Sequence, residues 1–88
     1  MKNLSKITML PLVENNNYPE AYPIVILDTN VRINEEVIVN NNEKAIVTDV
    51  CPINEYQKHL DFKNGGEFYT VFFTTESGTK SNIVVSIP

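Results

Sequence analysis

The sequence predicts an all-β fold, a small five- to six-stranded antiparallel barrel preceded by an extended N-terminal arm. Short apolar stretches alternate with turn-forming residues from residue 33 to residue 88, a spacing typical of small, strongly bent antiparallel sheets. The pattern shows no helix of ordinary length. The chain of 88 residues is 42% hydrophobic, which suits one domain with a single core.

Residues 1–23 differ in composition from the rest of the chain. An apolar stretch at residues 7–13 is followed by three consecutive asparagines and by Pro19 and Pro23. Prolines and asparagines at this spacing exclude a regular helix and favour an extended or looped connection. We therefore expect an N-terminal arm with a Pro/Asn-rich loop over residues 1–23, and the barrel domain over residues 24–88.

The first strands of the barrel are expected at residues 24–27, 37–39 and 45–50. Residues 24–27 are aliphatic and mostly β-branched, and they end at a polar Asp-Thr-Asn segment whose side chains bond their own backbone in turns. Residues 37–39 and 45–50 are expected to pair as a hairpin. Their loop contains three asparagines, residues 40–42, which tolerate the left-handed backbone that such loops need.

The second half of the barrel is expected to be another hairpin. Between Cys51 and Phe68 lies the longest irregular stretch, in which residues 54–60 are the one candidate for a short helix, about two turns long. Strands are expected at residues 69–75 and 81–87. Gly78 lies in the turn between them, where a residue with positive φ is needed.

Residues 34–87 also carry a pattern of valines, aromatic residues and turn residues in a fixed order. Its members are Asn34, Glu35, Val37 and Val39, then Ala45, Val47 and Val50, then Tyr69, Val71 and Phe73, and finally Gly78. This pattern resembles the small Src-homology-type β-barrels of the KOW and Tudor group, although Asn34 and Ala45 stand where those families have glycine. The resemblance implies the architecture and a tendency to act by binding. It carries over no ligand-contacting residue.

The composition of the chain indicates which partners and which cellular compartment to expect. The net charge is −4, so attraction to a phosphate backbone is not built into the chain, and nucleic acid is an unfavoured partner. The longest apolar runs fall far short of the roughly 20 residues that cross a bilayer, so no membrane span is expected. A single cysteine, Cys51, fits a reducing compartment, and we expect a cytoplasmic protein.

Cys51 and His59 flank a stretch that also holds Asp49, Glu55 and Asp61, all residue types that bind zinc. A structural zinc site takes four ligands at paired spacings, which one cysteine and one histidine do not supply. We therefore expect no metal and no cofactor.

The candidate nucleophiles are Cys51, Ser77 and Ser81, with His59 as the base. Proline follows Cys51 directly, and no glycine-rich oxyanion loop lies beside it. A protein that is not an enzyme is expected.

Four aromatic residues are the candidates for partner binding. Phe68 and Phe72 lie on the opposite face of their strand from Tyr69, Val71 and Phe73, because successive side chains of a strand alternate. Either the N-terminal arm covers these two phenylalanines as extra core, or they form a partner or homodimer surface. Tyr56 and Phe62 either close the barrel ends or take part in recognition, since aromatic residues are typical interface anchors.

The expected function is a non-enzymatic protein-binding module, such as an accessory or regulatory subunit. Two alternatives remain. One is an acidic inhibitor that presents carboxylates to a basic nucleic-acid-processing enzyme, and its affinity would fall with salt. The other is a barrel that contacts nucleic acid through a local positive patch of Arg32, Lys58 and Lys63.

Overall fold

The computed structural model describes residues 1–11, 21–53 and 67–87 of the chain. These residues form one sheet of seven strands in the order β1-β4-β5-β6-β7-β3-β2. The strands are β1 (Lys2–Asn3), β2 (Thr8–Pro11), β3 (Ala21–Ile26), β4 (Glu36–Val39), β5 (Glu43–Pro52), β6 (Glu67–Thr75) and β7 (Lys80–Ile87). Because the described ranges hold strands, turns and loops only, the all-β class is confirmed for them, and no helix suited to crossing a membrane occurs there.

All five expected strands are present, each within one or a few residues of its predicted bounds. They correspond to β3, β4, β5, β6 and β7. The irregular stretch predicted from Cys51 begins later than expected, because β5 continues through Pro52, which pairs with Tyr69 of β6. The short helix predicted at residues 54–60 lies outside the described residues.

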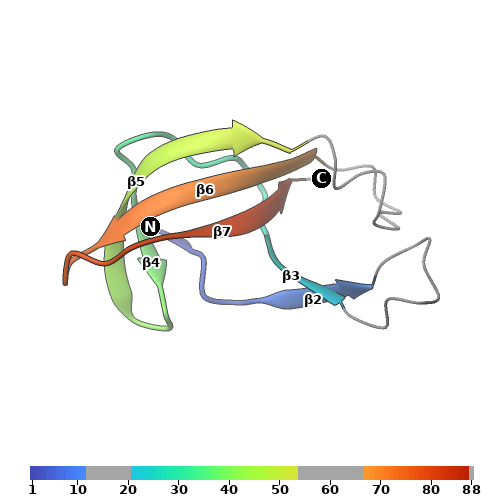
Figure 1. Cartoon of the computed structure of the whole chain (residues 1–88), viewed down its shortest axis with the longest axis horizontal. Helices are drawn as coiled ribbons and strands as arrows, with labels where there is room; N and C mark the ends of the chain where they lie inside the picture. The colour runs from blue at the N-terminus through green and yellow to red at the C-terminus, as the bar shows by residue number, and fades with distance from the viewer. Residues whose placement is uncertain (12–20, 54–66, 88) are drawn as a thin grey trace.

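The sheet differs from the predicted barrel in being open and mixed. Figure 1 shows it curled into a half-barrel, with β5, β6 and β7 side by side. Strands β4 to β7 pair antiparallel, as predicted, but β1 runs parallel to β4, and β3 runs parallel to β7. The parallel pair of β3 and β7 arises because β3 is joined to β4 by a crossing connection instead of a hairpin, and β3 then lies beside the last strand.

The first eleven residues supply both edges of this sheet. Strand β1 lies at the edge beside β4, and β2 lies at the opposite edge, where it pairs antiparallel with β3. The segment between them, residues 4–7, therefore runs from one edge to the other across the open side of the half-barrel (Figure 1). Leu4, at the start of this segment, is 2% exposed and belongs to the core.

The core fills the inner face of the curled sheet. Alternate residues of each strand point inward, so that Val37 and Val39 of β4 and Val71 and Phe73 of β6 are all buried. The remaining buried members are Leu4, Val25, Leu27, Val31, Ala45, Val47 and Val85. Most are aliphatic side chains of moderate size, as expected for a small barrel interior filled by side chains.

Residues in the left-handed region form the turns that were predicted from asparagine and glycine. Asn40 and Asn41 in the β4–β5 loop have φ of 50° and 75°, and Gly78 in the β6–β7 loop has φ of 88°. Gly78 donates its backbone N–H to the carbonyl of Thr75 at 2.9 Å, which closes that turn. These two hairpins therefore form as the sequence predicts.

A β-bulge in β5 changes which residues of that strand face the core. Val47 pairs with Phe73, but Asp49 pairs with Phe72, so Thr48 is one extra residue on β5. Both Thr48 and Asp49 are exposed, and Val50 returns to the inner face, where it packs against the core. The bulge thus returns Val50 to the core side of β5, whereas Ile46, before the bulge, is exposed.

Candidate partner-binding surface

The outer face of β5, β6 and β7 carries the one predicted binding residue that the structure leaves exposed among those it describes. Phe72 of β6 is 37% exposed, and it lies between Asp49 of β5 and Asn82 of β7 in the register of the sheet. Outward-facing positions on a half-buried antiparallel sheet are normally polar. A phenylalanine at such a position is the feature that sets this face apart.

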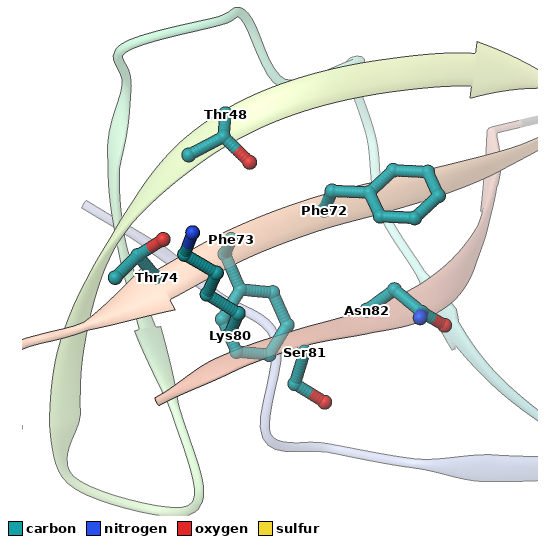
Figure 2. A pocket seen from close by; sticks show the side chains of 7 residues that line it. All are labelled: Thr48, Phe72, Phe73, Thr74, Lys80, Ser81 and Asn82. Carbon is teal, nitrogen blue, oxygen red and sulfur yellow. The ribbon is translucent and has the colours of Figure 1, made fainter. Parts of the chain in front are cut away.

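Phe72 lines a shallow, open hollow with a volume of about 320 Å³. Its lining residues are Thr48, Phe72, Phe73, Thr74, Lys80, Ser81 and Asn82. Figure 2 shows the Phe72 ring beside β6, with Thr48 of β5 on one side and Asn82 of β7 on the other. Alternation from Val47 places Thr48 on the outer face, and the bulge keeps Asp49 on that face beside it.

At the other end of β6, the side chains on this same outer face are buried. Phe68, four residues before Phe72 on β6, is 2% exposed, and Ser86 opposite it on β7 is fully buried. Ile24 on β3 is also fully buried. Because Phe68 is buried in the single chain, a partner would reach Phe72 and not Phe68.

Charges of both signs surround the exposed part of this face. Lys80 lines the hollow, and Asp49 lies directly opposite Phe72 across the β5–β6 ladder. Further along, Lys44 Nζ lies 3.9 Å from a carboxylate oxygen of Glu36, and both side chains are exposed. An apolar centre with a polar rim of mixed charge is typical of protein–protein interfaces.

Cys51 lies on β5, where its thiol contacts the carboxylate of Asp49. Its Sγ donates a hydrogen bond to Asp49 Oδ2 at 3.6 Å. Desolvation first, and the negative charge of Asp49 second, raise the pKa of the Cys51 thiol above its usual value. A nucleophilic or metal-binding cysteine needs the opposite shift, because the thiolate is the reactive form.

No metal-binding group of three or more histidine, cysteine, aspartate or glutamate side chains occurs within residues 1–11, 21–53 and 67–87. His59, Glu55 and Asp61, which the sequence placed near Cys51, lie outside those ranges. So do Tyr56 and Phe62, the two loop aromatics predicted to bind a partner.

The two serines considered as nucleophiles have different surroundings. Ser77 Oγ donates a hydrogen bond to Glu43 Oε2 at 2.9 Å and also lies 2.9 Å from Thr75 Oγ1. Its hydroxyl is thus committed to a structural network at the tip of the β6–β7 hairpin. Ser81 is exposed and lines the hollow beside Phe72.

The positive patch considered for nucleic acid is only partly described. Arg32 is exposed and lines a second open hollow with Lys2, while Lys58 and Lys63 lie outside the described residues. Lys2 is not a free cation, because its Nζ lies 3.1 Å from Glu35 Oε2 and 3.0 Å from the carbonyl of Asn30. Glu35 therefore offsets positive charge at this hollow.

Comparisons of the chain with protein-family models, with curated proteins and with solved structures found no match. The functional argument therefore depends on the geometry of the chain itself. Sequence reasoning identified Phe72 but missed Thr48 and Asn82, which line the same hollow. The signal for Thr48 was the consecutive polar pair Thr48-Asp49, which interrupts the alternation of an otherwise amphipathic strand.

Proposed function

We propose that the chain is a non-enzymatic protein-binding module, such as an accessory or regulatory subunit, and that its partner contacts the outer face around Phe72. The observation that supports this proposal is the exposure of Phe72 within a hollow of otherwise mainly polar side chains. Aromatic side chains supply a large share of binding energy at protein interfaces, where surrounding polar contacts exclude water.

The shape of the hollow favours a protein partner over a small molecule. Ligand pockets enclose most of their ligand's surface, and this hollow is shallow and open to solvent on one side of a sheet. A single projecting side chain of a partner fits such a shape. Ile46, 42% exposed on the outer face of the neighbouring strand, extends the apolar area available to it.

The proposal also includes a structural group and a cellular compartment for the chain. We place the chain with the small Src-homology-type barrels of the KOW and Tudor group. Support comes from Asn34, which stands where those families have glycine and has φ of 73°, a backbone that glycine adopts freely. A cytoplasmic location rests on the single cysteine, Cys51.

Site-specific photo-crosslinking tests the proposed function. A photoreactive benzoylphenylalanine replaces Phe72 in one variant and Ile33 in a matched control. Ile33 is also an exposed apolar residue, 55% accessible, but it lies in a turn away from this face. The proposal expects a crosslinked protein from position 72 and not from position 33 when each variant is irradiated in the native host. Equal crosslinking from the two positions, or none from position 72, contradicts it.

The same experiment separates the alternatives. A product of twice the chain mass from position 72 identifies a homodimer through this face. A yield of crosslinked product that falls when a cell lysate is irradiated at high salt is the outcome expected of an acidic inhibitor. No observation within the described residues favours the inhibitor or the nucleic-acid reading over the protein-binding module.

A further inference from the structure

Strand β1 is a short segment that fills an otherwise unpaired edge of the sheet. It consists of Lys2 and Asn3, which pair in parallel with Val37 and Ile38 of β4. Without it, β4 would be an edge strand with free backbone N–H and C=O groups. Residues 1–5 thus occupy the edge of the sheet beside β4.

The contacts of this segment combine one apolar anchor with hydrogen bonds. Leu4 is 2% exposed in the core, and its backbone N–H donates to the carbonyl of Ile38 at 2.7 Å. Lys2 pairs with Glu35, and Ser5 Oγ accepts a hydrogen bond from the backbone N–H of Asn41 at 2.8 Å. An extended segment held by main-chain bonds and one buried side chain is the arrangement of peptides that add a strand to a sheet edge.

The residues on either side of this segment lie in solvent. Met1 is 68% exposed, and Ile7, just before β2, is 52% exposed. Within the part of the chain that the structure describes, residues 2–5 bond residues 30–41. The segment can therefore leave its site through a change at residues 5–7 without breaking the hairpins of the sheet.

We propose that residues 1–5 exchange between two copies of this chain, so that β1 of each copy pairs with β4 of the other. A second copy is the occupant that the structure itself supports, because residues 2–5 demonstrate the fit and every copy carries them. A reciprocal exchange reproduces each contact of the closed chain and alters only the direction of the linker. This inference does not depend on the proposed function, since it uses a different edge of the sheet.

The fraction of exchanged dimer is expected to rise with the concentration of the chain. A segment tethered by a short linker experiences an effective concentration of about a millimolar at its own site, so the closed monomer dominates in dilute solution. The exchanged dimer is expected to become populated as the chain approaches about the same concentration.

A mixing experiment with single cysteines tests the exchange. One chain carries Asn3→Cys and the other Ile38→Cys, and both carry Cys51→Ser, so neither chain can form an internal disulfide. Asn3 and Ile38 are register partners on adjacent strands, and such strands lie about 4.8 Å apart, within the range that a disulfide spans. One chain carries a mass tag, so the mixed disulfide dimer is recognised by its size.

The control pair joins Asn3→Cys with Asn82→Cys, because Asn82 is more exposed than the half-buried Ile38 but lies on β7, separated from β1 by three strands. After mild oxidation of concentrated mixtures, the Asn3 and Ile38 pair is expected to give at least about tenfold more mixed dimer than the control pair. Equal yields from the two pairs would overturn the proposal.

A second pair of cysteine positions avoids the Ile38 substitution. Ser5→Cys and Asn41→Cys lie outside the strands, and Asn41 is exposed, with φ of 75°, so a cysteine there strains the β4–β5 loop and leaves β4 itself unchanged. These chains, again with Cys51→Ser, are expected to show the same excess over a Ser5→Cys and Asn82→Cys control. Circular dichroism of each variant verifies that the sheet is intact before mixing, and an intact sheet without excess mixed dimer contradicts the exchange.

Discussion

The hydroxyl of Ser77 donates a 2.9 Å hydrogen bond to the carboxylate of Glu43, so the tip of the β6–β7 hairpin is joined to the β4–β5 hairpin. The other carboxylate oxygen of Glu43 accepts from Asn40 Nδ2 at 3.1 Å. A backbone hydrogen bond also joins the two hairpins, since Glu76 N–H donates to the carbonyl of Lys44 at 3.0 Å. Two hairpins that the sequence predicts separately are thus connected at their loops.

Replacing Ser77 with alanine is expected to lower the melting temperature slightly, because Glu43 loses a side-chain donor. The effect is limited because both side chains reach solvent. Ser81→Ala is the matched control, since Ser81 is also exposed but lies outside this network. Thermal unfolding followed by circular dichroism measures both, and equal melting temperatures for the two variants would show that the Ser77 bond adds no stability.

The stability of the chain is expected to fall as the solution becomes acidic. Hydrogen bonds from Asn40 and then from Ser77 hold the pKa of Glu43 below its ordinary value of 4.5. The pKa of Glu35 is also lowered from 4.5, first by the backbone N–H of Arg32 and then, against the opposing effect of burial, by Lys2. A lowered folded-state pKa gives stability that is present above the unfolded value and is lost as pH falls through the folded value.

The measurement is a series of melting curves from neutral pH to well below 4.5. Glu43→Gln is expected to flatten part of this pH dependence, since the amide does not titrate. A wild-type curve that stays level through the acidic range, or a Glu43→Gln curve parallel to that of the wild type, contradicts the assignment.

Substitution of Phe72 separates a binding role from a core role. Phe72→Ser is expected to cost clearly less stability than a core substitution, because Phe72 is 37% exposed. The matched control is Phe73→Ala, on the next residue of β6, where 6% exposure places the ring in the core. That change is expected to cost about 3–5 kcal/mol, as for other buried phenylalanines. Urea denaturation compares the two, and a large loss for Phe72→Ser would assign its ring to the core instead of to a partner.

Leu4 tests whether the N-terminal segment is part of the folded core. Leu4→Ala is expected to cost about 2–5 kcal/mol, because the side chain is 2% exposed among core residues. Ile7→Ala is the control within the same segment, since Ile7 is 52% exposed, and its cost is expected to stay below about 1 kcal/mol. Similar unfolding free energies for the two variants would show that Leu4 is not anchored in the core.

The sequence predicts local structure here better than it predicts how the strands are arranged. Asn40, Asn41 and Gly78 adopt positive φ as their residue types suggest, and the strands of both hairpins lie where alternation places them. Strand β1 was missed because two residues carry no periodicity, and its position depends on Leu4 reaching the core. The parallel pair of β3 and β7 was missed because partners so far apart in sequence leave no turn signal.

At the candidate surface, too, the sequence predicts local features better than the arrangement of the strands. Alternation along residues 68–73 identified Phe68 and Phe72 as sharing a face opposite the core. It did not reveal that one is buried and the other exposed, because burial on the outer face depends on segments that cover it and not on the strand itself. The neighbours Thr48 and Asn82 come from other strands, so only the sheet register brings them beside Phe72.

Asn34 offers a test of the turn that precedes β4. Its φ of 73° lies in the left-handed region, where asparagine is tolerated, glycine is free of strain and residues with an ordinary side chain are strained. The turn is closed by the backbone N–H of Glu35, which donates to the carbonyl of Arg32 at 3.0 Å. Asn34→Ala is therefore expected to cost about 1–2 kcal/mol, and Asn34→Gly is expected to be close to neutral. Chemical denaturation of both variants measures the difference, and an alanine variant as stable as the glycine variant would show that this position needs no left-handed residue.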